Sequence, residues 1–180
     1  LNHTRQSADH LMTVINDILD YSQLQAGQLV VQSETFELRK ITGYAFDLFR
    51  PKVKSMVLDY RIEIDENLPT WVHTDRHRLM QILVNLLGNA LKFTHQGSVV
   101  FRVQWENPGV LFLVTDTGIG IAPERHAQIF KRFGQADMGI QPRYGGNGLG
   151  LAISQKLAHL LGGDIGFESA LGQGSRFWLR

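Results

Sequence analysis

The stretch from residue 75 to residue 114 constrains the fold more than any other part of this sequence. Asp75 is a good N-cap for a helix that we expect to run to about Phe93. After this helix, apolar residues alternate with polar ones from 99 to 105, the letters NPG turn the chain, and the apolar run VLFLV follows. The pattern predicts a long helix followed by two strands, the second of them buried.

The remaining periodicities predict further elements of both kinds. Apolar spacing indicates helices over residues 5–26, 37–50, 123–130 and 149–161, and strands over residues 58–64, 164–168 and 175–179. We therefore expect an α+β fold, a two-layer α/β sandwich in which one sheet is covered by helices on one face and is preceded by one long amphipathic helix.

The first of these helices has an apolar face that needs a partner. Leu11, Ile15, Ile18 and Leu19 recur at helical spacing, and Gly27 stands where a C-terminal cap belongs. Because the next segment looks extended, we expect the partner helix to lie outside this chain or on another copy. The sequence starts at Leu1 in the middle of a pattern, so we interpret it as part of a longer protein.

Composition excludes several classes of function. The chain has no cysteine, which excludes disulfides, thiolate metal sites and a cysteine nucleophile. The 18 basic and 17 acidic residues give a net charge of +1, which offers no electrostatic case for nucleic acid or an anionic membrane. No run approaches the roughly 20 apolar residues of a membrane span.

Two asparagines and a lysine share one face of the helix over residues 75–93. Asn85 and Asn89 are four positions apart, and Lys92 lies three positions further on the same side. For each residue alone, a satisfied core amide or a solvated lysine is the better interpretation. Together they favour a metal-bound polyphosphate, because amide oxygens can ligate Mg²⁺ and the ammonium group can contact a phosphate.

Asp116 ends the predicted buried strand and is followed closely by two glycines. A buried carboxylate needs a donor, and the exocyclic amine of a purine is a good one. Gly118 and Gly120 would let the backbone approach a ligand without a Cβ in the way. The alternative is a tight turn capped by Asp116, and a lone DxGxG motif is common in such turns.

A second glycine-rich segment, YGGNGLGLAIS, leads into the helix predicted at residue 149. Glycine-lined N–H groups at a helix N-terminus form an anion site, although a simple connector is the better interpretation of this segment alone. No Gly-Lys-Ser/Thr follows it, and no strand immediately precedes it, so it is neither a Walker A loop nor a Rossmann turn. The later segment LGQGSRFWL alone indicates only a hairpin turn.

Taken in order, these segments resemble the ATP-binding catalytic domain of sensor histidine kinases, within the larger family of gyrase B, Hsp90 and MutL ATPases. NLLGNALKFT resembles the N box, DTGIGI the G1 box, IFKRFGQAD the F box, GGNGLGLAIS the G2 box and GQGS the G3 box. The resemblance covers about residues 28–180. It implies a Bergerat-type ATP-binding fold, with a mixed sheet covered by helices on one face, and it implies ATP and Mg²⁺ as cofactors.

The resemblance also implies roles for individual residues. Asn89 would ligate Mg²⁺, with Asn85 supporting the metal or phosphates, and Lys92 would contact phosphate. Phe93 would flank the nucleoside and Asp116 would accept from the adenine amine. The other implied positions are Gly118, Ile119 and Gly120 along the base, Gly146, Gly148, Leu149 and Gly150 at the phosphates, Ser175 near the adenine, and a lid over residues 131–147 packed by Phe130 and Phe133. Asn147 is a small departure, because threonine is common there.

Position 85 separates the branches of this family. Hydrolysing members carry a glutamate there as the general base for water, whereas Asn85 cannot accept a proton at neutral pH. We therefore expect phosphoryl transfer to another acceptor, with Asn85, Asn89 and Lys92 as catalytic residues. The alternatives are a related ATPase or protein-serine kinase, and a catalytically weak module that docks to another kinase or regulator.

Residues 1–27 resemble the second helix of the dimerisation and phosphotransfer hairpin of histidine kinases. None of the seven histidines has the flanking residues of the phospho-accepting histidine, so we expect the acceptor outside this chain. His73 and His77 are spaced like zinc ligands, but we interpret them as surface residues. The resemblance implies a homodimer through the helical hairpin, a response regulator receiver domain and possibly another histidine kinase as partners, no nucleic acid, and a cytoplasmic position within a membrane-anchored sensor.

Overall fold

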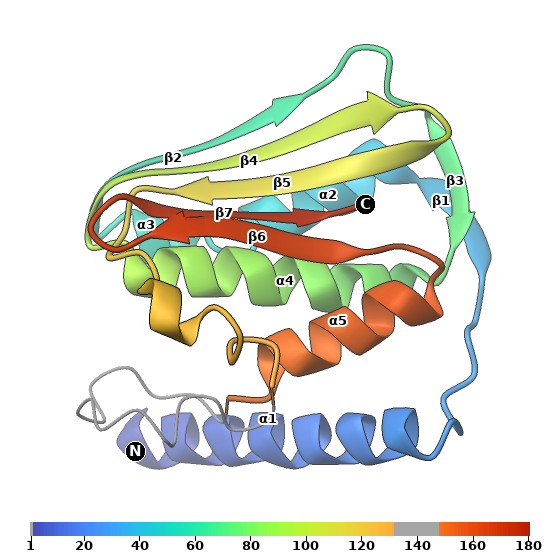
Figure 1. Cartoon of the computed structure of the whole chain (residues 1–180), viewed down its shortest axis with the longest axis horizontal. Helices are drawn as coiled ribbons and strands as arrows, with labels where there is room; N and C mark the ends of the chain where they lie inside the picture. Colours follow the sequence, from blue (N-terminus) through green and yellow to red (C-terminus); the bar gives the residue numbers. More distant parts are fainter. Residues whose placement is uncertain (1, 132–147) are drawn as a thin grey trace.

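The computed structural model describes residues 2–131 and 148–180 of the chain (Figure 1). Its elements in chain order are α1 (Asn2–Gln25), β1 (Glu34–Glu37), α2 (Leu38–Asp47), α3 (Arg50–Val53), β2 (Val57–Ile64), β3 (Trp71–Thr74), α4 (Arg76–Phe93), β4 (Gln96–Glu106), β5 (Gly109–Asp116), the short 3₁₀ helix η1 (Pro123–Arg125), α5 (Gly150–Leu160), β6 (Ile165–Ala170) and β7 (Gly174–Leu179). The expected α+β class is confirmed.

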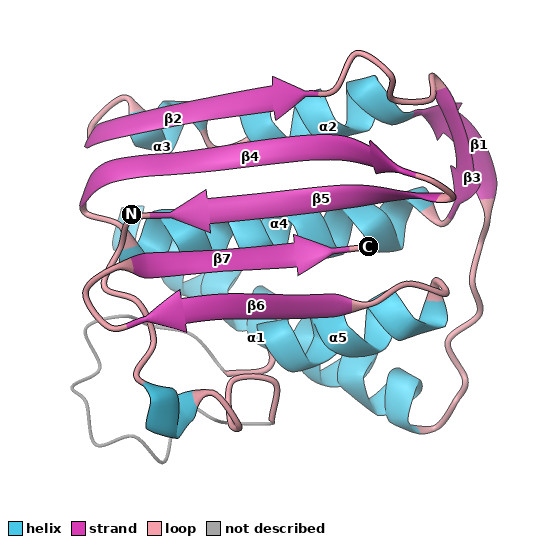
Figure 2. Cartoon of the chain, turned by 45° about the horizontal axis from the view of Figure 1, so that its top comes forward, coloured by secondary structure: helices cyan, strands magenta, loops and turns pink. Residues whose placement is uncertain are grey.

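The main sheet has five strands in the order β2-β4-β5-β7-β6. Strand β2 pairs with β4 in parallel, and every other neighbouring pair is antiparallel, so the sheet is mixed as expected. Helices α2, α4 and α5 lie on one face of it (Figure 2). Helix α1 lies beyond α4 and α5, on the side away from the sheet (Figure 1).

The core forms where the alternating face of the sheet meets the apolar face of α4. Val99, Phe101 and Val103 point to this side of β4 and are fully buried, while the residues between them are partly exposed. Leu83 and Leu87 on α4 are also fully buried. The apolar positions of α4 therefore hold the helix against the sheet and leave its remaining face for other contacts.

Two predicted helices are shorter than expected. The helix predicted over residues 37–50 ends at Asp47, and α3 follows it with Pro51 in its first turn. Proline has no backbone N–H to continue a helix but is well suited to a first helical turn, so it separates α2 from α3. The helix predicted over residues 123–130 is only η1, followed by turns.

A small second sheet was not predicted from the sequence. Strands β1 and β3 pair antiparallel over four residues each, from Glu34 opposite Thr74 to Glu37 opposite Trp71. This sheet lies at the end of the main sheet, just before the start of α4 (Figure 2).

Helix α1 contacts the rest of the chain through its C-terminal end. The carboxylate of Asp20 accepts from Arg78 at 3.1 Å and from Gln81 at 2.8 Å, both on α4. Tyr21 and Leu24 pack against the core, and the ammonium group of Lys156 on α5 lies 5.6 Å from the centre of the Tyr21 ring. The last two turns of this helix therefore pack on the rest of the chain, while the expectation of an outside partner concerns its apolar stripe further toward the N-terminus.

The apolar stripe of α1 nevertheless stays exposed further toward the N-terminus. Leu11, Met12, Ile15, Ile18 and Leu19 have exposed fractions between 41% and 59%. Gly27 ends the helix as predicted, with a φ of 64° and with the N–H of Gln28 donating to the carbonyl of Gln23. None of the described helices is long and apolar enough to cross a membrane.

The segment after α1 is fixed at the start of α4. Asp75 is 4% exposed, and one oxygen of its carboxylate accepts from the backbone N–H of Arg78 at 3.0 Å, as expected of an N-cap. The other oxygen accepts from the backbone N–H of Gln32 at 2.9 Å. One buried carboxylate thus caps α4 and holds the preceding segment against it.

Candidate functional site

The polar face of α4 carries the two asparagines and the lysine as predicted. Asn85, Asn89 and Lys92 are all partly buried, and the Asn89 amide nitrogen lies 3.5 Å from the Asn85 amide oxygen. The Lys92 ammonium group lies 4.9 Å from the centre of the Phe93 ring. Burial lowers the pKa of Lys92, and the nearby positive charge of Lys52 lowers it further. An anion that approaches Lys92 would therefore stabilise its charged form.

Asn85 also connects α4 to the start of α5. Its amide nitrogen donates to the hydroxyl of Ser154 at 2.8 Å, and Ser154 is only 2% exposed. A Cβ at Gly150 would lie 2.5 Å from the Asn85 amide oxygen, so glycine at this position leaves room for the amide. The sequence suggested Gly150 for phosphate binding, and its packing against Asn85 is a second reason for a glycine.

Asp116 lies at the end of β5 and is 6% exposed. Its carboxylate accepts from the backbone N–H of Gly118 at 2.8 Å and from the Thr94 hydroxyl at 3.4 Å. Burial raises its pKa, while these two donors and the backbone N–H of Ser175 act in the opposite direction. The carboxylate is therefore a buried acceptor that has kept part of its hydrogen-bonding capacity for another donor.

The loop after Asp116 is held between the end of α4 and the turn that joins β6 to β7. The backbone N–H of Ile119 donates to the carbonyl of Phe93 at 3.2 Å, and the Ile119 carbonyl accepts from Gly172 at 2.7 Å. Gly120 has a φ of 67°, and a Cβ there would collide with the carbonyl oxygen of Ala170. Close backbone approach explains the glycine at this position.

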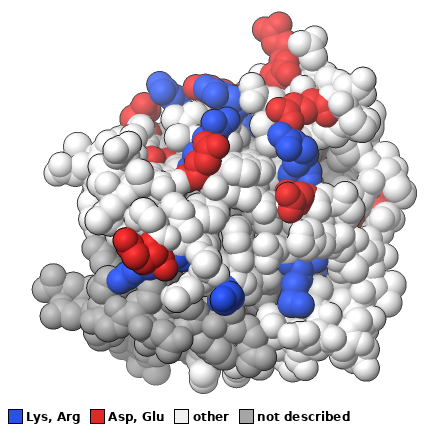
Figure 3. Space-filling view, in the orientation of Figure 1, with Lys and Arg blue, Asp and Glu red and all other residues white. Residues whose placement is uncertain are grey.

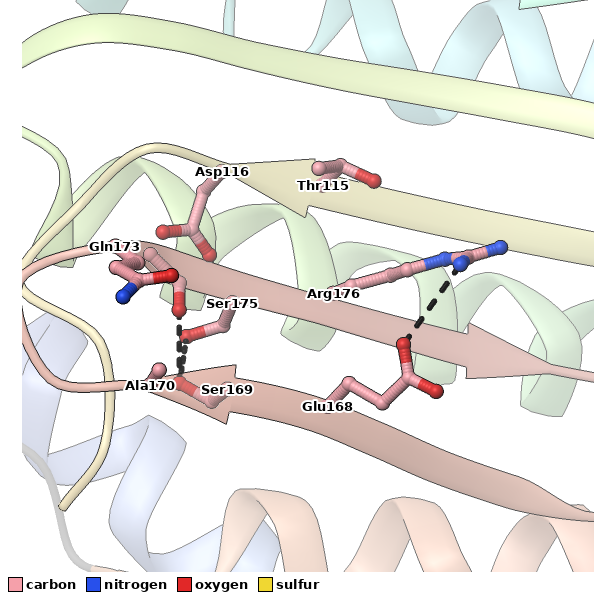
Figure 4. A pocket seen from close by; sticks show the side chains of 9 residues that line it. Thr115, Asp116, Glu168, Ser169, Ala170, Gln173, Ser175 and Arg176 are labelled. Atoms are coloured by element: carbon pink, nitrogen blue, oxygen red, sulfur yellow. Dashed lines mark hydrogen bonds and ion pairs between the residues drawn. The ribbon is translucent and has the colours of Figure 1, made fainter. Parts of the chain in front are cut away.

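A hollow where β5 and β6 end and β7 begins contains Asp116 and Ser175 (Figure 4). Thr115, Glu168, Ser169, Ala170, Gln173, Gly174 and Arg176 complete its lining. Asp116 and Ser175 are opposite each other on neighbouring strands, so the two residues expected at the adenine do lie together. The asparagines of α4 are not part of this lining.

The predicted residues thus form two groups joined by the last turn of α4. One group is Asn85, Asn89 and Lys92 with the start of α5, where Leu149 is buried and Gly148 has a φ of 65°. The other is Asp116 with residues 118–120 and Ser175. Phe93 and Thr94 connect them, because Phe93 bonds to Ile119 and Thr94 to Asp116. Phe133, Gly146 and most of the expected lid lie outside the described residues.

Three hydroxyl residues of the site were not identified from the sequence. Thr94 and Ser154 lie at the ends of the segments NLLGNALKFT and GGNGLGLAIS, and this position was the only available signal. Ser169 lies outside every quoted motif, and nothing in the sequence distinguished it. His73 and His77 are both exposed, in agreement with their interpretation as surface residues.

The charged side chains are mixed in sign over the described surface. On the face shown in Figure 3, basic and acidic groups lie beside one another. Among the described residues, ion pairs on the strands include Arg102 with Glu63 on neighbouring strands and Arg176 with Glu168 at 3.7 Å. The net charge of +1 is therefore accompanied by local pairing of charges.

Comparison with known proteins places this geometry in a family. Residues 74–180 match the model of the family described as histidine kinase-, DNA gyrase B-, and HSP90-like ATPase. The chain is 43% identical over 173 residues to the circadian input-output histidine kinase CikA of Synechococcus elongatus, covering 95% of this chain and 23% of that protein. It is 41% identical over 183 residues to the signal transduction histidine-protein kinase BarA of Escherichia coli K12, covering 99% of this chain and 20% of BarA.

Solved structures are similar over the whole chain. Full-length ShkA in complex with AMPPNP superposes with a TM-score of 0.86 at 35% identity, covering 99% of this chain and 37% of ShkA. The histidine kinase ThkA in complex with the response regulator protein TrrA gives a TM-score of 0.76 at 27% identity, covering 99% of this chain and 48% of that chain. The chain thus spans less than a quarter of the curated relatives named above.

Proposed function

The chain belongs to the family of histidine kinase-, DNA gyrase B- and HSP90-like ATPases, and on this premise we propose that it is the ATP-binding catalytic part of a sensor histidine kinase. In the intact protein it transfers the γ-phosphoryl group of ATP to a histidine outside this chain, for relay to a response regulator. We assign residues 28–180 to the catalytic domain and residues 1–27 to the second helix of the dimerisation and phosphotransfer hairpin.

One observation carries this proposal. A buried acceptor, Asp116, and a polar helix face with Asn85, Asn89 and Lys92 meet at the last turn of α4, through Thr94 and Phe93. A purine with an exocyclic amine suits the first group, and a metal-bound polyphosphate suits the second. A nucleotide triphosphate has both parts in one molecule.

The residues present fit Mg²⁺ as a partner of the phosphates. Asn89 supplies a hard amide oxygen, and its amide nitrogen faces Asn85, so the oxygen can turn to a metal. One or two neutral ligands suit an ion that takes most of its other ligands from phosphates and water. When bound, Mg²⁺ would neutralise part of the charge that develops on the transferred group.

The chain's own residues would contribute positioning and charge. We assign phosphate contacts to Lys92 and Gly146, and to Gly148, Leu149 and Gly150, which lie at the start of α5. Phe93, Gly118, Ile119, Gly120, Phe133 and Ser175 are assigned to the nucleoside end. Asn85 donates to Ser154 and has no basic atom, so it cannot activate water. This favours transfer to a protein acceptor over hydrolysis.

The exposed stripe of α1 supports a homodimer through the helical hairpin of the intact protein. Four of its apolar residues, Leu11, Ile15, Ile18 and Leu19, have exposed fractions of at least 41%. Burial of such a stripe in a four-helix bundle would remove it from water. By family, we propose a response regulator receiver domain and a second histidine kinase as further partners. We also propose a membrane anchor elsewhere in the protein, with this part in the cytoplasm. We propose no nucleic acid partner.

Calorimetric titration with AMP-PNP, with and without Mg²⁺, tests the nucleotide site. We expect Mg²⁺ to tighten binding to the wild-type chain, and Asn89→Ala to lose about tenfold of that affinity, a typical loss for a perturbed metal site. Asn67→Ala is the matched control, because Asn67 lies in an exposed turn beside Asp65.

Two results would contradict the proposal. A folded wild-type chain without affinity for AMP-PNP would favour a docking module that does not bind nucleotide. Equal Mg²⁺ dependence in wild type and Asn89→Ala would remove Asn89 from the metal site. Transfer itself is tested by adding labelled ATP to the chain joined to the helix that precedes it in the intact protein.

A further inference from the structure

Ser169 connects three parts of the nucleoside end of the site. Its hydroxyl lies 2.8 Å from the backbone N–H of Ile121, 2.9 Å from the carbonyl of Gly174 and 3.0 Å from the hydroxyl of Ser175. Ser169 and Ser175 are directly opposite each other on β6 and β7. Figure 4 shows the two serines joined across these strands, with Asp116 on the next strand.

The partners of Ser169 favour one direction for the hydrogen bond between the serines. The N–H of Ile121 can only donate and the carbonyl of Gly174 can only accept, so Ser169 accepts from the first and donates to the second. A serine hydroxyl has one proton and two lone pairs. Because Ser169 donates its proton to Gly174, we assign the hydroxyl of Ser175 as the donor in the contact between the two serines.

This direction changes what Ser175 can offer to a ligand. With its proton committed to Ser169, the Ser175 oxygen has only lone pairs left. The neighbouring Asp116 carboxylate is also an acceptor. Asp116 and Ser175 therefore both present acceptors, and neither of these two side chains can donate to an oxo group of a ligand.

We propose that Ser169 is a positioning residue for base selection, which holds Ser175 as an acceptor so that the site favours purines with an exocyclic amine over 6-oxo purines. The inference rests on the proposed function, because it assigns the nucleoside to this end of the site. It adds a residue of the same hollow that acts through the hydroxyl of Ser175.

Ser169 also has a structural role that must be separated from this one. Its contact with Ile121 holds the loop after Asp116, next to the close approach of Gly120 to Ala170. Loss of that contact alone would weaken binding of all nucleotides to a similar degree. Loss of the orienting contact would change the preference between bases, so the ratio of two affinities separates the roles.

The test compares ADP with inosine diphosphate, which has an oxo group in place of the amine. Affinities are measured by calorimetric titration for the wild-type chain, Ser169→Ala and Ser169→Thr. We expect Ser169→Ala to lower the ADP preference about fivefold, the scale of one hydrogen bond, because Ser175 can then donate to the oxo group. Ser169→Thr keeps a hydroxyl and should restore the preference.

Two further variants test the contact from the side of Ser175 and control for the loss of a buried hydroxyl. Ser175→Ala removes the acceptor itself while Ser169 keeps both backbone contacts, so it should also lower the ADP preference. Thr42→Val is the control for loss of a buried hydroxyl, because Thr42 bonds only to carbonyls of Leu38 and Arg39 in the described structure. It should leave the preference unchanged.

The outcomes are distinguishable. An unchanged ratio in Ser169→Ala, with both affinities equally reduced or unaffected, would overturn the inference and leave the proposed function standing. If Ser169→Ala does not fold, an unchanged ratio in Ser175→Ala overturns it in the same way. A folded wild-type chain that binds neither nucleotide would overturn the proposed function, and this inference with it.

Discussion

The Asp116 carboxylate lies in a desolvated position at the end of β5, where two backbone N–H groups and the Thr94 hydroxyl stabilise its charged form. Burial acts against these donors and has the larger effect, so the pKa of Asp116 is raised from its ordinary value of 3.8. A buried acceptor with a raised pKa is suited to a ligand donor, which would restore part of the lost solvation.

This environment predicts a pH-dependent difference in stability between the wild-type chain and Asp116→Asn. A carboxyl group with a raised pKa binds its proton more tightly in the folded state, so protonation favours folding. As the pH falls from 7 toward 4, the free energy of unfolding of the wild type should therefore rise relative to Asp116→Asn. Urea titrations of both chains at several pH values measure this, and a constant difference would contradict the assignment.

Lys92 predicts an alkaline limit to nucleotide binding. Burial and Lys52 lower the pKa of Lys92, so its charge is lost at a lower pH than that of an exposed lysine. We expect the affinity for ADP to fall at a lower pH than the loss of charge on an exposed lysine would give, and to fall later in Lys92→Arg, because the guanidinium group stays charged. Titrations from pH 7 to 10 check this, and identical profiles for the two chains would exclude a phosphate contact by Lys92.

Some site residues could be predicted from the sequence for a simple reason. Asn85, Asn89 and Lys92 share a helix face because the helical repeat puts them there, and Asp116 follows an apolar run that reads as a buried strand. Ser169 could not be predicted, since its partners Ile121 and Ser175 depend on strand register and loop position. Contacts between segments distant in the sequence leave no local spacing to detect.

At the scale of elements, α4 depends on Asp75 at its first turn. Asp75→Ala removes the N-cap of α4 and leaves the backbone N–H of Gln32 without its acceptor. We expect a loss of about 2 kcal/mol in the free energy of unfolding. Asp75→Asn, which keeps one acceptor oxygen, should lose less.

Urea denaturation of the two Asp75 variants measures this loss. Asp59→Ala is a suitable control, because Asp59 is an exposed acidic residue that pairs with Arg61 on the outer face of β2. Equal stabilities for Asp75→Ala and wild type would show that the cap and the contact with Gln32 contribute nothing.

The long elements could be predicted well and the short ones poorly. Helix α4 has both a cap and a sustained apolar period, and β4 alternates between buried and partly exposed residues from Ser98 to Gln104, so each pattern is long enough to be distinctive. Strands β1 and β3 have only four residues each, which is too short for an alternation to be distinctive. Their pairing is decided by the segments around them.

At the scale of the whole molecule, α1 has two different environments along its length. Its last turns are fixed by the Asp20 contacts to α4, while the stripe with Ile15 and Leu19 is exposed. An exposed apolar stripe of this length normally marks an interaction surface. The C-terminal end of α1 thus contacts α4, and the exposed stripe is left for a partner.

This division predicts how α1 substitutions behave. If the proposed homodimer forms through this stripe, Ile15→Asp with Leu19→Asp should abolish concentration-dependent self-association and leave the free energy of unfolding within about 0.5 kcal/mol of wild type. Sedimentation velocity measures the association and urea denaturation measures the stability. Self-association that persists in the double variant would assign the interface to another surface.

The parallel pairing of β2 with β4 has a consequence for the order of folding. All of α4 lies between these strands in the sequence, so Val57 can meet Gln96 only after the chain has made a long crossover. Distant pairings of this kind slow folding, because the intervening loop must close before the contacts form. The helix that carries the asparagines is therefore expected to fold before this edge of the sheet closes, and refolding should slow when its cap is removed.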